Sequence, residues 1–235
     1  MIRTAIILAG GFGTRLQSVV KDHPKPMADI NGKPFLQHLL DFLILQGINT
    51  CILSVGYKWE TIQEYFGSSY RSINLSYVVE ETPLGTGGAI LNAVQSCEEE
   101  ELFVFNGDTF FAIDLALFYH EHSQQTSLLS LALKSMTNFD RYGVVVTDGA
   151  GRVNSFEEKK FYSTGNINGG IYLLNRTLFD QLQLPEKFSF EKEVMEKYYA
   201  TIPFQGVVFD DYFIDIGIPE DYERAKNELE QFTHR

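Results

Sequence analysis

Cysteine is scarce in this sequence. Cys51 and Cys97 are the only two among 235 residues, and they form no CxxC pair, so a disulfide framework is not expected. The sequence also lacks any run of about 18 apolar residues, the length that a membrane-spanning helix needs. The apolar residues 5–9 are too few for the core of a signal peptide. These absences favour a soluble protein of a reducing compartment, the cytoplasm.

Positive charge is also in short supply. The sequence has 19 lysine and arginine residues against 31 aspartate and glutamate residues, which gives a net charge of −12 with histidine neutral. Nucleic acid and anionic membranes repel a protein this acidic, so neither is expected as a partner. Any phosphate group must therefore be bound by a few local cations, by backbone N–H groups or through a divalent metal ion.

Several familiar sequence patterns are missing. The sequence contains no hexapeptide series that would build a parallel β-helix, and no GxxxxGK[ST] phosphate-binding loop. The segment GGFGTRL at residues 10–16 lacks the third glycine of the dinucleotide fingerprint. The next expected strand, residues 50–55, ends without the acidic residue of that fingerprint. These absences argue against P-loop proteins and nicotinamide dehydrogenases.

The first half of the chain alternates strand and helix patterns. Strands are predicted over residues 4–9, 50–55, 74–79 and 101–108, and helices over residues 34–46, 57–66 and 85–96. In the first helix, Phe35, Leu39 and Leu43 share one face. Pro34 and Gly47 mark its start and its end. Repeated βα units predict an α/β fold with a mixed, mainly parallel sheet flanked by helices.

The second half is more mixed. Predicted here are strands over residues 126–134 and 167–175, a hairpin over residues 142–159 with its turn at Asp148 and Gly149, a strand ending at Asp215, and a final helix after Pro219. His120 and His122 fit the surface of a helix better than a metal site. No linker or repeat interrupts the pattern, so a single domain over residues 1–235 is predicted.

The stretch ILAGGFGTRLQSVVKDHPKPM, residues 7–27, places a glycine-rich turn and basic residues directly after the first strand. Backbone N–H groups in such a turn can close on phosphate oxygens, although three glycines alone are equally compatible with a plain tight turn. Lys25 lies between Pro24 and Pro26, whose rings restrict the backbone and so direct the lysine side chain. The combination favours a site for an anion.

Motifs along nearly the whole chain occur in the order found in one enzyme family. They are LAGGFGTRL with PKPM, EETPLGTGGA, FNGD, YGVV, FEEK, NGGIY and DIGIPEDY. With these motifs the sequence resembles the sugar-1-phosphate nucleotidyltransferases, also called nucleotide-sugar pyrophosphorylases. The resemblance implies the Rossmann-like, GT-A-like fold of nucleotide-diphospho-sugar transferases. It also implies two substrates, a nucleoside triphosphate and a sugar 1-phosphate.

By this resemblance the first loop holds the nucleoside triphosphate. Gly10, Gly11 and Gly13 would approach the base, the ribose and the phosphates. Arg15 and Lys25 would act as the catalytic cations that neutralise the triphosphate and the departing pyrophosphate. The further nucleotide-binding residues that the resemblance implies are Leu8, Thr14, Glu80, Gly85 and Thr86.

The resemblance also implies Mg²⁺, with Asp108 of FNGD and Asp215 of DIGIP as its two ligands. Mg²⁺ is commonly bound by one or two carboxylates together with substrate phosphates. A sugar 1-phosphate oxygen would attack the α-phosphorus in line, and pyrophosphate would leave. Because a phosphate monoester has a second pKa of about 6, this nucleophile is mostly ionised at neutral pH and needs no general base.

The sugar phosphate would lie against a second group of residues. The resemblance assigns to this group Gly143, Glu158, Lys159, Asn168 and Gly170, with Lys159 on the phosphate. Two positions depart from the usual family pattern. Lys160 replaces a proline, so the conformation of the local turn is not determined by the sequence. Gly169 replaces an alanine, which is expected to widen the pocket.

Glu80 bears on the choice of base. A carboxylate can accept two parallel hydrogen bonds from guanine N1–H and N2–H₂, whereas uracil or thymine offers a single donor. This favours GTP, although a plain solvated charge remains an alternative for Glu80. The stretch SVVKDHPKPMADINGKPFL is similar to that of heptose 1-phosphate guanylyltransferases. Guanylyl transfer to mannose 1-phosphate and uridylyl transfer to an amino sugar phosphate stay open.

Two functions of other classes are less compatible with these residues. A non-catalytic nucleotide-sugar sensor could have lost Lys25, Asp108 or Asp215, yet all three are present. A glycosyltransferase on the same sheet usually carries a DxD metal motif, whereas NGD offers one aspartate. The resemblance leaves a homo-oligomer open.

Overall fold

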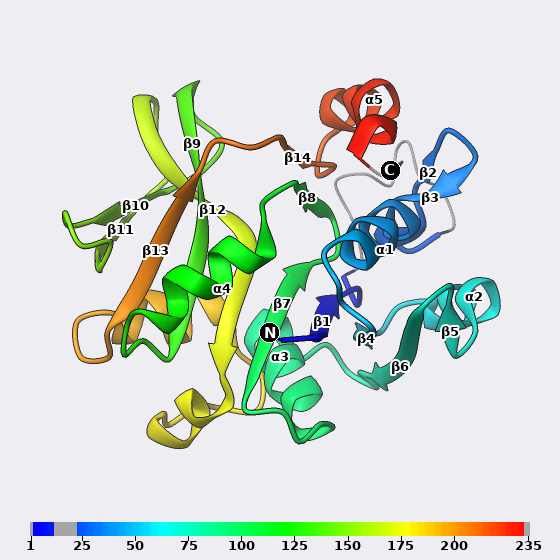
Figure 1. Ribbon diagram of the computed structural model, residues 1–235, viewed down its shortest axis with the longest axis horizontal. Helices are drawn as coiled ribbons and strands as arrows, with labels where there is room; N and C mark the ends of the chain where they lie inside the picture. Colours follow the sequence, from blue (N-terminus) through cyan, green and yellow to red (C-terminus); the bar gives the residue numbers. More distant parts are fainter. Residues whose placement is uncertain (1, 12–22, 233–235) are drawn as a thin grey trace.

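The computed structural model describes residues 2–11 and 23–232, and a mixed sheet runs through its centre (Figure 1). Its strands are β1 Thr4–Leu8, β4 Thr50–Val55, β5 Ser69–Tyr70, β6 Ile73–Val79, β7 Glu101–Asn106, β9 Leu129–Phe139, β12 Tyr162–Asn175 and β13 Phe204–Phe209. Their order across the sheet is β13–β9–β12–β7–β1–β4–β6–β5. β1 thus lies inside the sheet, between β4 and β7.

The sheet is parallel around β1. This strand pairs in parallel with β4 and with β7, and β4 pairs in parallel with β6, whereas β12 runs antiparallel to β7 and β9. Residues Thr4 to Ile7 of β1 are all buried. Near-continuous apolar runs of this kind are typical of parallel strands that are covered on both faces. The predicted mixed, mainly parallel sheet is confirmed.

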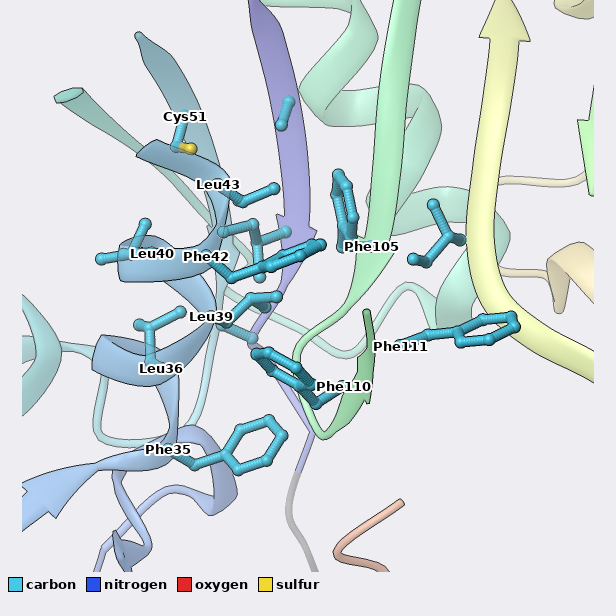
Figure 2. Close-up of a cluster of buried hydrophobic side chains, with 14 of the residues drawn as sticks. Phe35, Leu36, Leu39, Leu40, Phe42, Leu43, Cys51, Phe105, Phe110 and Phe111 are labelled. Atoms are coloured by element: carbon cyan, nitrogen blue, oxygen red, sulfur yellow. The ribbon is translucent and has the colours of Figure 1, made fainter. Parts of the chain in front are cut away.

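Helices cover both faces of this sheet. They are α1 Phe35–Leu45, α2 Trp59–Phe66, α3 Gly85–Gln95, α4 Leu115–Ser123 and α5 Pro219–Glu228, together with a π-helical segment, η3 Phe190–Glu196. Successive side chains of a strand point to opposite faces. Accordingly, Ala5 and Ile7 belong to the core beneath α1, and Ile6 belongs to the core beneath α3 and η3. Figure 2 shows the first core, where Phe42 of α1 meets Phe110 with ring centroids 5.1 Å apart.

The elements predicted in the first half are confirmed to within a few residues. The strand predicted over residues 101–108 ends at Asn106, however, so Gly107 and Asp108 lie in a turn. The Gly107 N–H donates to the Leu8 carbonyl oxygen over 3.0 Å. A Cβ at position 107 would lie only 2.4 Å from that oxygen, so glycine is needed for the turn to pack against the end of β1.

The second half departs further from the predictions. The strands β9 and β12 are longer than predicted, and β13 at the sheet edge was not predicted at all. The hairpin is present as β10 Val144–Thr147 and β11 Val153–Glu157, but its turn is longer than the predicted Asp148-Gly149 pair. Asp148 Oδ1 accepts hydrogen bonds from the N–H groups of Ala150 and Arg152, which extends the turn to Arg152.

One prediction about the histidines is wrong. Both residues lie on α4, and His120 is exposed as predicted, but His122 is only 2% exposed. Its Nδ1 lies 2.7 Å from Ser130 Oγ, and its Nε2 lies 3.5 Å from Glu101 Oε1. Burial lowers the pKa of His122 below the ordinary histidine value, so the ring is a neutral link between α4 and the sheet.

Short strand pairs complete the fold. β14 Phe213–Asp215 runs antiparallel to β8 Thr109–Phe111, and β2 Asp29–Ile30 forms a hairpin with β3 Lys33–Pro34. Figure 1 shows β14 leading from β13 into α5, beside β8. Among the described residues, no helix is both long and apolar enough to cross a membrane.

Candidate active site

Two aspartates from distant parts of the chain meet at the carboxyl end of β7. Asp108 lies in the turn between β7 and β8, and Asp215 is the last residue of β14, where it lies opposite Thr109 of β8. The Ile216 N–H donates to the Asp108 carbonyl oxygen over 3.0 Å, which fixes the two segments together. Ligands of open α/β sheets bind outside the carboxyl ends of the strands. The two predicted metal ligands are therefore neighbours.

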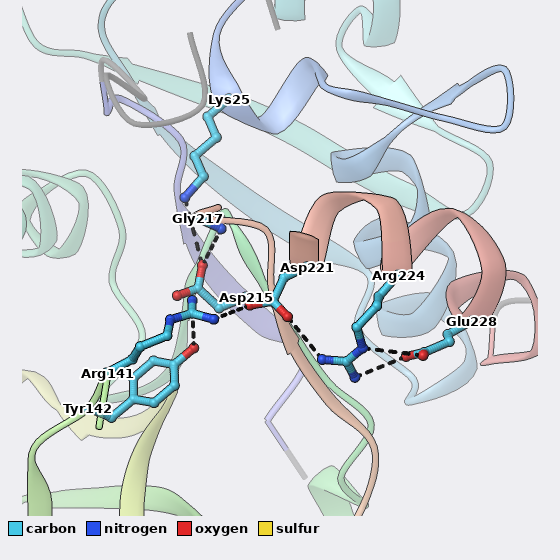
Figure 3. Close-up of polar contacts among 8 residues, drawn as sticks. All are labelled: Lys25, Arg141, Tyr142, Asp215, Gly217, Asp221, Arg224 and Glu228. Atoms are coloured by element: carbon cyan, nitrogen blue, oxygen red, sulfur yellow. Dashed lines mark hydrogen bonds and ion pairs between the residues drawn. The ribbon is translucent and has the colours of Figure 1, made fainter. Parts of the chain in front are cut away.

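Lys25 lies between these two aspartates. It begins a short 3-10 helix, Lys25–Met27, after Pro24. Its Nζ donates to Asp108 Oδ2 over 2.6 Å. The same Nζ lies 3.8 Å from Asp215 Oδ1, and Figure 3 shows the lysine side chain reaching toward this aspartate. The lysine side chain is only 13% exposed, so water screens these contacts little. Lys25 is thus brought to the same place as the predicted metal ligands.

The charge of Asp215 is unfavourable without a cation. Burial raises the pKa of Asp215 above the ordinary aspartate value, and the nearby negative charge of Asp108 raises it further. Lys25 and the Gly217 N–H, which donates to Asp215 Oδ1 over 2.8 Å, act in the opposite direction. A pair of acids in this state favours the binding of additional positive charge.

The arrangement suits Mg²⁺, which often takes only one or two ligands from the protein, better than a metal ion whose ligands are all protein side chains. Two carboxylates that converge on one cation are hard oxygen ligands, which Mg²⁺ prefers. Within residues 2–11 and 23–232 there is no cluster of three acidic, histidine or cysteine side chains that could hold a metal ion. The remaining ligands would have to come from substrate phosphates and water, which is the usual manner of Mg²⁺ binding.

A cavity of about 490 Å³ opens beside Asp215. Its walls come from β7, β8, β10, β11, β12 and η3, and they combine apolar and charged side chains. The lining residues include Asn106, Thr109, Tyr142, Gly143, Phe156, Glu157, Glu158, Lys159, Asn168, Gly170, Ser189, Glu191, Lys192, Met195, Glu196, Phe213 and Asp215. This volume suits a small polar ligand.

All five residues predicted to bind the sugar phosphate line this cavity. Gly143, Glu158 and Lys159 come from the β10–β11 hairpin, and Asn168 and Gly170 come from β12. Asn168 is fixed in place, because its Nδ2 donates to the Tyr172 hydroxyl over 2.9 Å and its Oδ1 accepts from the Gly170 N–H. The structure thus gathers a group that the sequence spreads over 28 positions, from 143 to 170. Their binding role stays a prediction.

The turn that carries Glu158 and Lys159 is held without the proline that the family resemblance leads one to expect there. Lys160 forms an ion pair with Glu157 at 3.3 Å. The Tyr162 hydroxyl lies 2.9 Å from Glu157 Oε2 and 2.9 Å from the Glu158 carbonyl oxygen. These contacts define the turn, which the sequence had left open.

The expectation that Gly169 widens the cavity is not what the packing indicates. A Cβ at position 169 would lie 2.5 Å from Phe111 Cδ1 and 2.8 Å from the Ala132 carbonyl oxygen. The missing methyl group therefore makes room for the Phe111 ring and the β9 backbone. Gly169 is also not among the residues that line the cavity.

Glu80 lies where β6 ends, next to the end of β4. Its Oε1 accepts from Ser54 Oγ over 3.3 Å, and its Oε2 accepts from the Leu84 N–H over 3.0 Å. Gly10 faces it, because a Cβ at position 10 would lie 2.7 Å from Glu80 Oε1. Each carboxylate oxygen has two lone pairs, so both can accept a further hydrogen bond from a ligand. The predicted role in reading the base stays open.

The other predicted nucleotide-binding residues are placed in part. Leu8 and Gly11 lie at and beyond the end of β1, and Gly11 is exposed. Gly13, Thr14 and Arg15 lie outside the described residues. Gly85 and Thr86 begin α3 but contact η3 and the chain before it: a Cβ at position 85 would lie 2.5 Å from the Phe188 carbonyl oxygen, and Thr86 Oγ1 donates to Glu191 Oε2. Their nucleotide contacts stay a prediction.

Several residues of the site carried no sequence signal. Arg141, just before β10, forms an ion pair with Asp221 of α5, which also pairs with Arg224 at 2.9 Å (Figure 3). This network ties α5 to the segment that carries Tyr142, and the Tyr142 ring packs on Phe213 of β14. The partners of Arg141 and Tyr142 lie about 70 to 80 positions away in the sequence, so no local sequence pattern could indicate these contacts.

Comparisons with known proteins agree with this geometry. The nucleotidyl transferase family model matches residues 4–232. A D-glycero-alpha-D-manno-heptose 1-phosphate guanylyltransferase from Aneurinibacillus thermoaerophilus is 49% identical, over 97% of this chain and 99% of its own length. A protein of the same name from Campylobacter jejuni is 51% identical, over 93% and 96%. A mannose-1-phosphate guanylyltransferase from Mycobacterium tuberculosis is 36% identical, over 96% of this chain and 64% of its own length.

Solved structures confirm the predicted fold. HddC from Yersinia pseudotuberculosis, complexed with GMP-PN, has a TM-score of 0.86 and 40% identity, and the match covers 97% of this chain and 100% of that chain. An inositol-1-phosphate CTP transferase from T. maritima has a TM-score of 0.82 at 18% identity, which shows the shared fold alone. The family match over nearly the whole chain and these similarities lead to one conclusion: the chain belongs to the nucleotidyl transferase family.

Proposed function

We propose that this protein transfers GMP from GTP to D-glycero-α-D-manno-heptose 1-phosphate, with GDP-heptose and pyrophosphate as products. The observation that carries the proposal is the near-full-length identity of 49% and 51% to two proteins that bear the name of this guanylyltransferase. The site is compatible with such a reaction, since a polar cavity for a sugar adjoins a cation and two carboxylates.

The chemistry asks the protein to bring two anions together. An oxygen of the sugar 1-phosphate forms a bond to the α-phosphorus, and the bond from that phosphorus to the α,β-bridging oxygen breaks. Lys159 would bind the sugar phosphate from the cavity wall, and Lys25 would bind the triphosphate, a role that the resemblance also gives to Arg15. Positioning and charge neutralisation would then supply most of the rate enhancement. No histidine lines the described cavity, which suits a phosphate nucleophile that is already ionised.

Asp108 and Asp215 would hold Mg²⁺ in the loaded enzyme. When bound, the ion would supply positive charge that offsets the negative charge of the phosphate groups. For Lys25 this implies a change of partner, because its Nζ now neutralises the same two carboxylates. The ammonium group would then turn to the phosphate oxygens.

Glu80 would select guanine. Its carboxylate is fixed by Ser54 and Leu84, and it retains lone pairs for the two parallel donors of guanine. Gly10 lets the backbone after β1 approach this carboxylate, because a Cβ at position 10 would lie 2.7 Å from Glu80 Oε1. The solved HddC structure contains GMP-PN, which is consistent with a guanine nucleotide as the substrate here.

Mannose 1-phosphate is the second candidate acceptor. The mannose-1-phosphate guanylyltransferase from Mycobacterium tuberculosis is 36% identical, and this chain spans 64% of its length. The heptose enzymes are more similar and match end to end, so heptose 1-phosphate is the preferred acceptor.

The test is pyrophosphate release with Mg²⁺, in which GTP, UTP, dTTP, CTP and ATP are crossed with the 1-phosphates of heptose, mannose, glucose and N-acetylated sugars. A dominant signal for GTP with heptose 1-phosphate is expected. A dominant signal for another pair would overturn the substrate assignment and leave nucleotidyl transfer standing. If no pair gives pyrophosphate release and the protein is folded and binds nucleotide, a non-catalytic sensor is indicated.

A further inference from the structure

Glu191 is a fixed carboxylate in the wall of the cavity. It is the second residue of η3 and is partly buried. Its Oε2 accepts hydrogen bonds from Thr86 Oγ1 over 2.7 Å and from Ser189 Oγ over 2.8 Å. Among the described residues none donates a hydrogen bond to its Oε1, so one oxygen is held while the other has free acceptor capacity.

The support behind Glu191 is rigid. Thr86 Oγ1 also accepts from the Phe190 N–H over 2.9 Å, so a single hydroxyl holds both the start of η3 and its carboxylate. Phe188 pairs with the start of α3 through three backbone hydrogen bonds: its N–H donates to Leu84 O, and its carbonyl oxygen accepts from the N–H groups of Gly87 and Gly88. A Cβ at position 87 would lie 2.1 Å from the Phe188 ring, so these segments pack without a gap.

Other carboxylates of the cavity lack this combination. Glu157 is committed to the turn through Tyr162 and Lys160. Glu158 and Glu196 are exposed, and no hydrogen bond of their side chains to a described residue is present. Of these glutamates, Glu191 is the one that is both partly buried and aligned by two hydroxyl groups. A preorganised acceptor loses less conformational entropy when a ligand binds.

We propose that Glu191 binds a hydroxyl group of the sugar, and that Thr86 and Ser189 are the positioning residues that orient its carboxylate. The inference rests on the proposed function for the cavity as the sugar site, but not on which sugar occupies it. A bound sugar would displace water from Glu191 Oε1, and an acceptor that loses water without gaining a donor is costly, so this contact would also discriminate against sugars that lack the hydroxyl group. Thr86, which resemblance places at the nucleotide, would then act on the sugar side.

The test compares Glu191→Gln, Thr86→Val and Thr86→Ser with the wild type in steady-state kinetics. Glu191→Gln should lower kcat/KM for the sugar 1-phosphate by roughly 10- to 100-fold, the range expected for the loss of one hydrogen bond to a charged group. The KM for GTP should change by less than about twofold, because Glu191 contacts the sugar and not the nucleotide. Thr86→Val should give a smaller loss of the same kind, and Thr86→Ser should restore it.

Glu64→Gln is the matched control, since Glu64 is an exposed carboxylate on α2 and the charge change is the same. Circular dichroism and melting temperature establish that each variant folds. A second readout is calorimetric binding of GDP and of the GDP-sugar product: Glu191→Gln should weaken the GDP-sugar and leave GDP unchanged. Equal weakening of both ligands, or an unchanged KM for the sugar phosphate, would overturn the proposal.

The two proposals fail in different ways. If GTP with heptose 1-phosphate is inactive for the wild type but another pair is active, the substrate assignment fails, and the Glu191 variants are compared on the active pair. If no pair is active, calorimetry measures the binding of heptose 1-phosphate and mannose 1-phosphate directly and tests the role of Glu191 without turnover. Weaker binding by Glu191→Gln than by Glu64→Gln supports the inference, and equal binding overturns it.

Discussion

Lys25 Nζ lies 2.6 Å from Asp108 Oδ2, and this contact joins residues 83 positions apart. The lysine approaches the second aspartate, Asp215, at 3.8 Å. One ammonium group thus neutralises both carboxylates, and burial together with the charge of Asp108 disfavours the ionised form of Asp215. Exchange of this cation for a metal ion would free Lys25 to meet a phosphate group.

Lys25→Ala is expected to lower turnover by roughly 100- to 1,000-fold, the usual loss when one group that stabilises transition-state charge is removed. The melting temperature should also fall, because Asp108 and Asp215 lose their shared counter-charge. Steady-state kinetics and thermal unfolding measure the two effects. Lys187→Ala, which removes an exposed lysine outside the site, should change neither. Normal turnover in Lys25→Ala would exclude the lysine from catalysis.

Asp215→Asn should abolish turnover and yet stabilise the ligand-free fold at neutral pH, with a melting temperature higher by a few degrees. Burial and Asp108 raise the pKa of Asp215 in the folded state, so its stabilising contribution is present below the ordinary aspartate pKa and is lost as pH rises through the raised value. The asparagine variant avoids that loss. Its advantage should therefore shrink in acid, when wild-type Asp215 is protonated. Thermal unfolding from pH 4 to pH 8 tests this, with exposed Asp180→Asn as the control.

Glu80→Gln should reduce kcat/KM for GTP by about tenfold or more, because the amide cannot accept both parallel hydrogen bonds from guanine. The kcat/KM for UTP should change little, so the ratio of kcat/KM for GTP to that for UTP should fall. Competition assays with mixed nucleotides give the ratio directly. If nucleotide preference in the variant equals that of the wild type, Glu80 does not read the base.

Tyr162→Phe should raise the KM for the sugar 1-phosphate several-fold, with little change in the KM for GTP. The hydroxyl lies 2.9 Å from both Glu157 Oε2 and the Glu158 carbonyl oxygen, and it holds the turn that presents Lys159. Net hydrogen-bond contributions of about 0.5–1.5 kcal/mol correspond to such a change. The aromatic ring still stacks on Phe139, so the melting temperature should be nearly unchanged. A lower kcat with an unaltered KM would contradict this positioning role.

Stability is expected to fall as pH drops below about 6.5, the ordinary histidine pKa. Burial lowers the pKa values of His38 and His122 in the folded protein, so the unfolded chain binds more protons in this range. Melting temperatures from pH 8 to pH 5 should show the decline. His122→Gln should flatten it, whereas His120→Gln, on the exposed side of α4, should leave the slope unchanged. If the melting temperature of His122→Gln falls with pH as steeply as that of the wild type, protonation of His122 does not cause the decline.

Residues with local patterns were predictable from the sequence. The βα units of the first half have clear periodicity and bounded ends, so β4 was predicted residue for residue and α1 to within a residue at each end. The strand end at Asp108 pointed to the ligand-binding edge of the sheet, and the family resemblance supplied Asp215 as its partner. The resemblance also grouped the five residues predicted to bind the sugar phosphate, and these line one cavity.

The sequence alone thus determined the fold class, the family and the residue types at the strand ends, because these depend on local periodicity and contiguous motifs. Only the tertiary structure decided which side chains share a partner. Thr86 meets Glu191 across 105 positions, and His122 is buried against Ser130 on a helix that by itself predicts exposure. Such contacts depend on how whole elements pack, and no pattern within a short window carries that information.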